Sequence, residues 1–394
     1  MSVQDRVGCA DLLGGRIPAV ISGTSCLERL TECSGDFGRT SVVVVADEAV
    51  VRTGYAERVR EACAQFDDYR VHVVAPGEPT SQSVDAAADV VRAAGSPVVV
   101  GVGGGSALDT AKQAAAVAGG PFGVEHYALG MNALPAGAPV VAIPTTAGTG
   151  SEVTRTCVVT DRHGRKVWTW SDGLLPQLVL LDPTATATLP PHITAATGLD
   201  AFVHAVEAVT GRRADADVEA PALRAVRLVI DHLPAAVADG SDLDERLAMQ
   251  EAALLAGLAI DRGGTGIAHS IGHALGTLAH VPHGVSVAIG LGAAIDWNID
   301  GARGAFASVA DVVGVPVSAL GDGYRSLLEA SRFGAAVTRV GPLGVDPGDL
   351  AETMVAVENR PMFDNNCRRA ADSERLSLAR AALRLWDELS GDAP

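Results

Sequence analysis

The chain has 394 residues, of which 48% are hydrophobic, 20% charged and 4% aromatic. This length exceeds what a single hydrophobic core usually serves, so two domains are expected. The formal net charge of −17 at pH 7 excludes nucleic acid or an anionic membrane surface as the natural partner, because both bind basic protein surfaces. No apolar run reaches the roughly 18 residues that a membrane span requires.

The cysteines and the first residues bear on the cellular compartment. Six cysteines are scattered without a C-x-x-C pair, a pattern typical of reduced thiols in a cytosolic protein. Residues 1–15 show no basic region followed by an apolar core, so no signal peptide is predicted. We therefore expect a cytoplasmic protein. Separately, we expect a small-molecule substrate and a homodimer or larger homo-oligomer.

The first half of the chain alternates β-branched apolar runs with helical segments. The apolar runs are bounded by Gly, Pro or Asp, as are strands of a parallel sheet buried on both faces. Helical segments lie between them, for example residues 55–66 and 83–94. This alternation predicts a doubly wound α/β domain. The predicted strands are residues 41–47, 69–77, 96–106, 138–146 and 177–182.

From about residue 187 the pattern becomes helical. The segments are rich in Ala and Leu at helical period, and no β-branched run bounded by turns interrupts them. We predict an α/β domain with a parallel sheet over residues 1–186 and an all-helical domain over residues 187–394. The predicted helices are residues 195–209, 217–239, 242–260, 265–280 and 284–295.

A glycine-rich loop, VGVGGGSALDTAK at residues 100–112, follows a strand and opens a helix. Glycines let the backbone approach a phosphate, and a helix N-terminus offers free N–H groups to it. A glycine cluster alone is as often a tight turn. Ser106 is able to cap the helix or bond a phosphate, and Asp109 and Lys112 are spaced to face one cleft. The spacing differs from G-x-G-x-x-G and the loop follows a later strand, so this is not an ordinary Rossmann fingerprint.

Two further polar sites follow strands. Asp47 ends the first strong strand, where a carboxylate can accept hydrogen bonds from ribose hydroxyls and repel a 2′-phosphate; the alternative is a helix cap. IPTTAGTGSEVT, residues 143–154, is dense in hydroxyls, which suits either a pyrophosphate or a plain surface loop. Its candidate donors are Thr145, Thr146, Thr149 and Ser151.

Histidines are crowded into GIAHSIGHALGTLAHVPHG, residues 266–284. Asp200 and His204 lie four apart on a preceding apolar helix and share one of its faces. One carboxylate and two or three imidazoles would suit a divalent zinc or iron ion, while the alternative is a buried helix with hydrogen-bonded imidazoles. The histidines of the crowded stretch are His269, His273, His280 and His283.

Taken together and in order, these motifs resemble the iron-containing (group III) alcohol dehydrogenase family over residues 15–390. The family resemblance implies an N-terminal dinucleotide-binding α/β domain, a C-terminal helical domain and an active-site cleft between them. It also implies NAD(H) and a divalent metal, Fe(II) with Zn as the alternative. The motifs are GGGSALDTAK at 103–112, IPTTAGTGSE at 143–152, LDP at 181–183, GLDAFVHAVE at 198–207 and H-x-x-x-H…PHG at 269–284.

The resemblance assigns roles to individual residues. His273 matches a histidine that contacts substrate and is our candidate for a proton relay, whereas His280 is taken as structural. Asp47 matches the position that favours NAD(H) over NADP(H), and Asp109 lies near the nicotinamide end. The implied metal ligands are Asp200, His204, His269 and His283. The other implied cofactor contacts are Gly103, Gly104, Gly105, Ser106, Thr145, Thr146, Thr149 and Lys166.

The expected reaction is hydride transfer between nicotinamide and a small, functionalised or plain, alcohol or carbonyl substrate. Two departures from the family pattern, Arg262 and the triplet Asn366-Cys367-Arg368, lie near the expected substrate site. Arg262 either contacts an anionic substrate group, if the helix of His269 extends back to it, or pairs with a surface acid. Alternative functions are a glycerol dehydrogenase, a maleylacetate reductase, a dehydroquinate-synthase-like lyase, or an inactive binding module.

Overall fold

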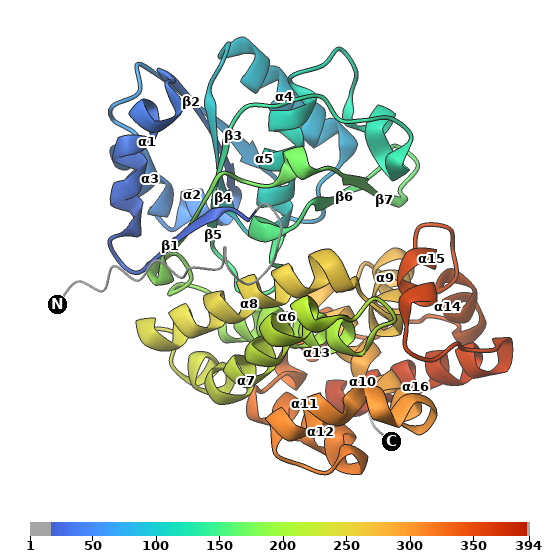
Figure 1. The fold of residues 1–394 in the computed structure, drawn as a ribbon. Coiled ribbons are helices and arrows are strands. Elements are labelled where there is room, and N and C mark those ends of the chain that lie inside the picture. Colours follow the sequence, from blue (N-terminus) through green and yellow to red (C-terminus); the bar gives the residue numbers. More distant parts are fainter. Residues whose placement is uncertain (1–16, 392–394) are drawn as a thin grey trace. The chain divides into compact units, whose positions relative to one another are not determined.

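A computed structural model describes residues 17–391, so Cys9 and the stretch used for the signal-peptide prediction lie outside the described residues. The chain divides into two compact units (Figure 1). The first comprises the described residues up to Thr146 together with Gly150–Thr188. The second comprises Ala147–Thr149 and the described residues from Leu189 onward. The five cysteines within the described part form no disulfide.

The first unit contains a six-stranded sheet in the order β1-β8-β5-β4-β2-β3, with every pair parallel. Alternate valines of β2 face opposite sides of the sheet, since Val42 and Val44 pack with one apolar cluster and Val43 and Val45 with another. Burial on both faces explains the continuous apolar runs. The strands are β1 (Ala19–Ser22), β2 (Ser41–Asp47), β3 (Asp68–Val74), β4 (Val98–Gly103), β5 (Val140–Pro144) and β8 (Leu178–Leu181).

Helices cover both faces of this sheet. Leu30 of α1 and Val59 of α3 join the cluster on one face, and Val84 of α4 and Ala111 of α5 join the cluster on the other. The fold class is therefore the predicted doubly wound α/β sheet followed by helices. The helices of this unit are α1 (Leu30–Phe37), α2 (Glu48–Arg52), α3 (Tyr55–Ala62), α4 (Ser81–Ala93) and α5 (Gly105–Val117).

Three strands escaped the sequence analysis. β1 has only four residues, and an antiparallel ribbon of β6 (Thr156–Thr160) and β7 (Lys166–Trp170) lies outside the main sheet. The ribbon strands alternate buried and partly exposed side chains, so they lack the continuous apolar run by which the other strands were found. The predicted set of five strands was therefore incomplete, although 177–182 does contain the last strand, β8.

The second unit is all-helical, as predicted. Its core consists of Ala, Val, Leu and Ile side chains from successive helices. Within the described residues no single helix is long and apolar enough to cross a membrane, although the bent pair His283–Val313 and Val317–Ala330 reaches that length and composition when counted together. The helices are α6 (Pro191–Thr210), α7 (Ala216–Ala238), α8 (Leu243–Gly263), α9 (Ile267–Ala279), α10 (His283–Ala302), α11 (Ala307–Val313), α12 (Leu320–Ala330), α13 (Gly334–Val340), α14 (Pro347–Thr353), α15 (Arg360–Asn365) and α16 (Asp372–Ser390).

Candidate metal centre and cofactor loops

The strand order of the first unit identifies where a ligand would bind. β3 lies next to β2 on one side, whereas β4 and β5, which follow β3 in the chain, lie on the other side of β2. The direction of winding therefore changes between β2 and β4, and open α/β sheets bind ligands outside the carboxyl ends of the strands at such a point. Asp47 ends β2 and the glycine loop begins at the end of β4. This explains why the glycine loop follows a later strand.

A direct contact joins Asp47 to the glycine loop. Asp47 Oδ1 accepts a hydrogen bond from Val50 N at 2.7 Å and so caps α2, while Oδ2 accepts from Gly104 N at 3.2 Å. Gly103 has a φ of +155°, and a Cβ there would lie 2.6 Å from Ala107 Cβ and 2.7 Å from Asp47 Oδ2. The loop thus depends on glycine for both its conformation and its close approach. Asp47 is therefore both the last residue of β2 and the N-cap of α2, so the helix-cap alternative is correct, and its contact with a ribose stays a prediction.

Two charged residues of α5 make contacts within the unit, and one of them, Lys112, is placed differently from expectation. Lys112 is buried and does not face a cleft; its Nζ donates to the carbonyl oxygens of Ser151 at 2.7 Å and Thr154 at 2.8 Å. Asp109 accepts hydrogen bonds from Ser151 Oγ and from Val158 N, and burial raises its pKa. Lys112 and Asp109 therefore hold the segment after the threonine loop against α5.

The remaining cofactor candidates are distributed around these strand ends. Gly104 is the N-cap of α5 and Gly105 its first residue, so Ser106 lies in the first turn and is not the cap. Thr145 N donates to Gly103 O at 2.9 Å, and Thr146 lies against Gly104, which places the two loops side by side. Lys166 at the start of β7 donates to Glu78 at 3.0 Å; its expected contact with the cofactor stays a prediction.

Four candidate metal ligands converge in the second unit. Asp200 and His204 lie on α6, His269 on α9, and His283 begins α10. One ligand atom from each lies within 4.8 Å of the others. Three helices therefore bring the four side chains to one point. Asp200, His204 and His269 are buried there, and His283 is partly exposed.

The distances and the unpaired atoms fit a divalent cation. Asp200 Oδ1 lies 3.6 Å from His204 Nε2 and 3.5 Å from His283 Nε2, close to the separation of about 3.4 Å between ligand atoms of a tetrahedral ion. Asp200 Oδ1 and His269 Nε2 are buried without a hydrogen-bond partner. Buried polar atoms normally have partners, and two orphaned acceptors at one point are what a metal would satisfy.

The other two histidines differ in position. The His273 ring centroid lies 5.5 Å from that of His283 and 6.1 Å from that of His269, and the side chain is partly exposed. His273 therefore borders the cluster without contributing to it. His280 is exposed and ends α9 in the left-handed conformation at φ +53°. The stretch is thus divided into two candidate ligands, a neighbouring histidine and a helix cap, and the proposed roles of His273 and His280 stay predictions.

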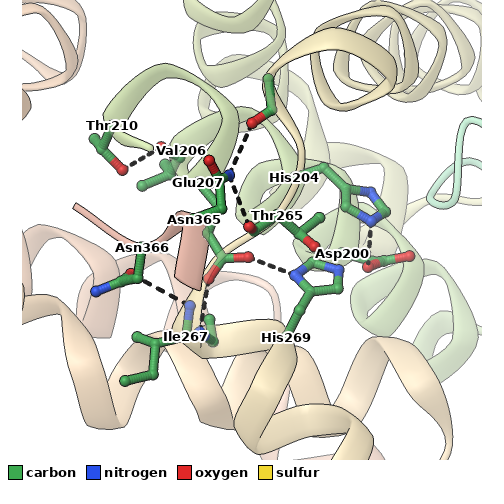
Figure 2. A network of polar contacts seen from close by, with 12 residues as sticks. Asp200, His204, Val206, Glu207, Thr210, Thr265, Ile267, His269, Asn365 and Asn366 are labelled. Atoms are coloured by element: carbon green, nitrogen blue, oxygen red, sulfur yellow. Dashed lines mark hydrogen bonds and ion pairs between the residues drawn. The ribbon is translucent and has the colours of Figure 1, made fainter. Parts of the chain in front are cut away.

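The ligand histidines are oriented by groups that sequence reasoning did not assign. His204 Nδ1 lies 3.3 Å from Gly148 O, an approach only glycine allows because a Cβ would lie 2.7 Å from Thr197 O. His269 Nδ1 lies 2.5 Å from Glu207 Oε2 (Figure 2). Both contacts leave Nε2 for a metal. The position of Glu207, three residues after His204 and seven after Asp200, places it on the ligand face of α6 and was the available signal.

The structure gives structural roles to two of the residues that depart from the family pattern, Arg262 and Asn366. Arg262 lies on α8, and α9 begins only at Ile267, so the expected shared face with His269 is wrong. Its guanidinium pairs with Asp215 at 3.2 Å and Asp217 at 2.9 Å, which is the surface alternative. Asn366 is buried, and its Oδ1 accepts from Ile267 N at 3.2 Å, so this residue supports the start of α9.

Comparison with known proteins agrees with this geometry. Residues 18–183 match the iron-containing alcohol dehydrogenase family and residues 194–381 match the C-terminal domain of the Fe-containing alcohol dehydrogenase family. The chain belongs to the iron-containing alcohol dehydrogenase family.

The similarity to individual members of the family extends over nearly the whole chain. It is 32% identical over 352 residues to an NAD-dependent methanol dehydrogenase of Bacillus methanolicus, covering 89% of this chain and 91% of that protein. It is 30% identical to a sulfoacetaldehyde reductase of Bilophila wadsworthia, covering 93% and 97%. The structure of a sulfoacetaldehyde reductase from Bifidobacterium kashiwanohense in complex with NAD⁺ superposes with a TM-score of 0.84 at 28% identity, covering 94% and 98%.

Proposed function

We propose that the chain is a metal-dependent, NAD(H)-linked alcohol dehydrogenase or aldehyde reductase for small substrates. The observation that carries the proposal is the four-ligand cluster with its two orphaned buried atoms, Asp200 Oδ1 and His269 Nε2. The curated relatives act on alcohols or aldehydes by their names, and one is called NAD-dependent. Residues 1–186 form the proposed NAD-binding domain and residues 187–394 the proposed metal-binding catalytic domain.

Each group of residues has a proposed task. Asp200, His204, His269 and His283 hold a divalent ion, Fe(II) or alternatively Zn(II). When bound, the ion supplies Lewis acidity towards the substrate oxygen and NAD(H) carries the hydride. His273, beside the ligands and partly exposed, gives or takes the proton of the substrate hydroxyl on its path to water.

The cofactor is proposed to lie on the strand ends of the first unit. Its pyrophosphate is held by the N-terminus of α5 and by hydroxyl groups of the second loop. Asp47 faces the adenosine ribose, where its charge favours NAD(H) over NADP(H), and Asp109 and Lys166 complete the proposed set. The pyrophosphate contacts are Gly103, Gly104, Gly105, Ser106, Thr145, Thr146 and Thr149.

The cellular location, the oligomeric state and the type of substrate are the remaining parts of the proposal. Free thiols at the five described cysteines support a reducing, cytoplasmic location. A homodimer or larger homo-oligomer is the proposed assembly, to be measured by light scattering after size exclusion. The hypothesis of a functionalised substrate was argued from Arg262, whose pairing with Asp215 and Asp217 removes that support.

The decisive experiment is metal loading followed by a substrate panel. Protein loaded anaerobically with Fe(II), and separately with Zn(II), is assayed for NADH consumption with short, branched and anionic aldehydes. We expect about one ion per chain and NADH oxidation in step with alcohol formation, which also distinguishes the enzyme from a lyase that uses NAD transiently. Protein that binds neither ion and consumes no NADH would contradict the proposal and favour an inactive binding module.

A further inference from the structure

Glu207 occupies an unusual place behind the candidate ligands. It is 5% exposed on α6, three residues after His204. Both of its carboxylate oxygens are engaged. Oε2 lies 2.5 Å from His269 Nδ1 (Figure 2), and Oε1 accepts a hydrogen bond from Ala268 N at 2.6 Å. One oxygen therefore contacts the side chain of the ligand His269, and the other contacts the backbone N–H of the residue before it, Ala268.

The environment of Glu207 holds it rigidly. A Cβ on Gly266 would lie 2.9 Å from Glu207 Oε1 and 3.0 Å from Asn366 Oδ1, so the backbone entering α9 passes directly over both side chains. Ile267 N donates to Asn366 and Ala268 N donates to Glu207. The first N–H groups of a helix have no partner within the helix, so these two side chains fix the start of α9.

A carboxylate at Nδ1 also determines the chemistry of His269. A neutral imidazole carries one proton, and an acceptor facing Nδ1 places that proton on Nδ1. The lone pair then resides on Nε2, the orphaned atom that faces Asp200 and the other ligands. Partners of this kind fix the tautomer and ring orientation of a metal ligand and raise its basicity.

We propose that Glu207 is the positioning residue of the metal site, holding His269 with Nε2 directed at the ion through a carboxylate that also anchors the first turn of α9. This inference rests on the proposed function, since it concerns the same metal. It extends the site from four ligands to a fifth side chain that does not touch the ion.

Glu207→Gln separates the carboxylate from the shape of the side chain. Glutamine has one acceptor oxygen where glutamate has two, but the two groups that it faces, His269 Nδ1–H and Ala268 N–H, are both donors. The amide NH₂ would therefore be turned towards one donor, or would itself donate to Nδ1 and move the proton of His269 to Nε2. Either arrangement disturbs the ligand with almost no change in volume.

The chain offers a matched control in the same unit. Glu245 Oε2 lies 2.8 Å from His232 Nδ1, a glutamate–histidine pair on α7 and α8 that includes none of the four ligands. Glu245→Gln makes the same chemical change in a pair that is more exposed to solvent, with side chains 33% and 24% exposed. It reports any general effect of replacing a paired glutamate.

The experiment measures zinc affinity by competition with a chromophoric chelator at pH 7.5, together with the visible absorption spectrum of the cobalt-loaded protein. We expect Glu207→Gln to bind zinc about 10- to 100-fold more weakly than the parent and to change the cobalt spectrum, whereas Glu245→Gln stays within about twofold with an unchanged spectrum. Zinc affinity within twofold of the parent for Glu207→Gln would overturn the inference. So would weaker affinity with an unaltered cobalt spectrum, because that would indicate general loosening.

Two outcomes are kept distinct from this result. If the parent binds no metal, the proposed function fails rather than the role of Glu207. If Glu207→Gln does not fold, Glu207→Asp retains the charge but is one methylene shorter, so its contact with His269 is weakened. We then expect an intermediate zinc affinity and a shifted cobalt spectrum, and parent-like values for both would overturn the inference.

Discussion

The two units build their candidate sites from different parts of the chain. In the α/β unit the site consists mainly of backbone at strand ends, with Gly103 and Gly104 lying against Asp47 and Thr146. In the helical unit it consists of side chains from three helices, directed at one point. Alanine substitutions that remove atoms should therefore disable the second site, whereas substitutions that add atoms should disable the first.

The largest effect is expected when the side chain of a candidate metal ligand is truncated. His269→Ala and Asp200→Ala each remove one of four donors, so we expect loss of bound metal and at least a roughly thousandfold fall in kcat/KM, equivalent to about 4 kcal/mol. Metal analysis and NADH-linked assays measure both. His273→Ala should retain metal while losing turnover by about 100-fold or more. His280→Ala is the control and should retain both; a metal-free His273→Ala would contradict its separation from the ligands.

Two buried glutamates, one in each unit, test the electrostatics of the comparison. Burial raises the pKa of Glu152 to about 7, as it does for Glu207. Between the ordinary glutamate pKa and pH 7 the folded state keeps a proton that the unfolded state releases, so stability falls as pH rises through this window. Glu152→Gln should remove up to about 3 kcal/mol of that decline in urea unfolding of metal-free protein. A decline identical to that of the parent would show that Glu152 ionises normally.

In the glycine loop the damaging change is an addition. Gly103→Ala places a Cβ 2.6 Å from Ala107 Cβ at a φ of +155°, so we expect about 2 kcal/mol of destabilisation and at least tenfold weaker NADH binding by fluorescence titration. Gly23→Ala is the control, because Gly23 has a φ of +114° with no atom within 4 Å of its Cβ. It should lose stability without losing NADH affinity. Equal losses of affinity in both would remove the steric explanation.

Cofactor choice tests Asp47, the side chain proposed to distinguish NAD(H) from NADP(H). Asp47→Asn keeps an oxygen to cap α2 at Val50 N but removes the charge. The ratio of kcat/KM for NADPH to that for NADH should rise about tenfold, a change of roughly 1.4 kcal/mol. Steady-state kinetics with both cofactors measure it. A parent enzyme that already uses the two cofactors equally would contradict the role of Asp47.

The smallest effect is expected at Arg262. Its pairing with Asp215 and Asp217 is partly exposed to solvent, so Arg262→Ala should cost under about 1 kcal/mol of stability. Turnover of an anionic and a neutral aldehyde of similar size should change equally. A selective loss of turnover with the anionic aldehyde would instead support a contact between Arg262 and the substrate.

The sequence predicted what periodicity and residue type encode. Continuous valine runs identified β2 and β4 because both faces are buried, and the D-x-x-x-H spacing placed the candidate ligands Asp200 and His204 on one face of α6. β6 and β7 escaped because a ribbon outside the main sheet has no continuous run. The spacing of Glu207 places it on the ligand face of α6, but its role was not predicted because its partner His269 lies 62 residues away in sequence. Lys112 escaped because spacing alone does not distinguish a cleft from a buried contact.

The membership of Ala147–Thr149 in the helical unit has a consequence for dissecting the protein. These three residues are flanked on both sides by segments of the α/β unit, so the helical unit is discontinuous in sequence. A fragment comprising residues 189–394 would lack Gly148, whose carbonyl oxygen contacts His204 Nδ1. Such a fragment would leave that imidazole without its orienting partner. Limited proteolysis after residue 188 or gene truncation there would therefore not isolate a faithful metal site.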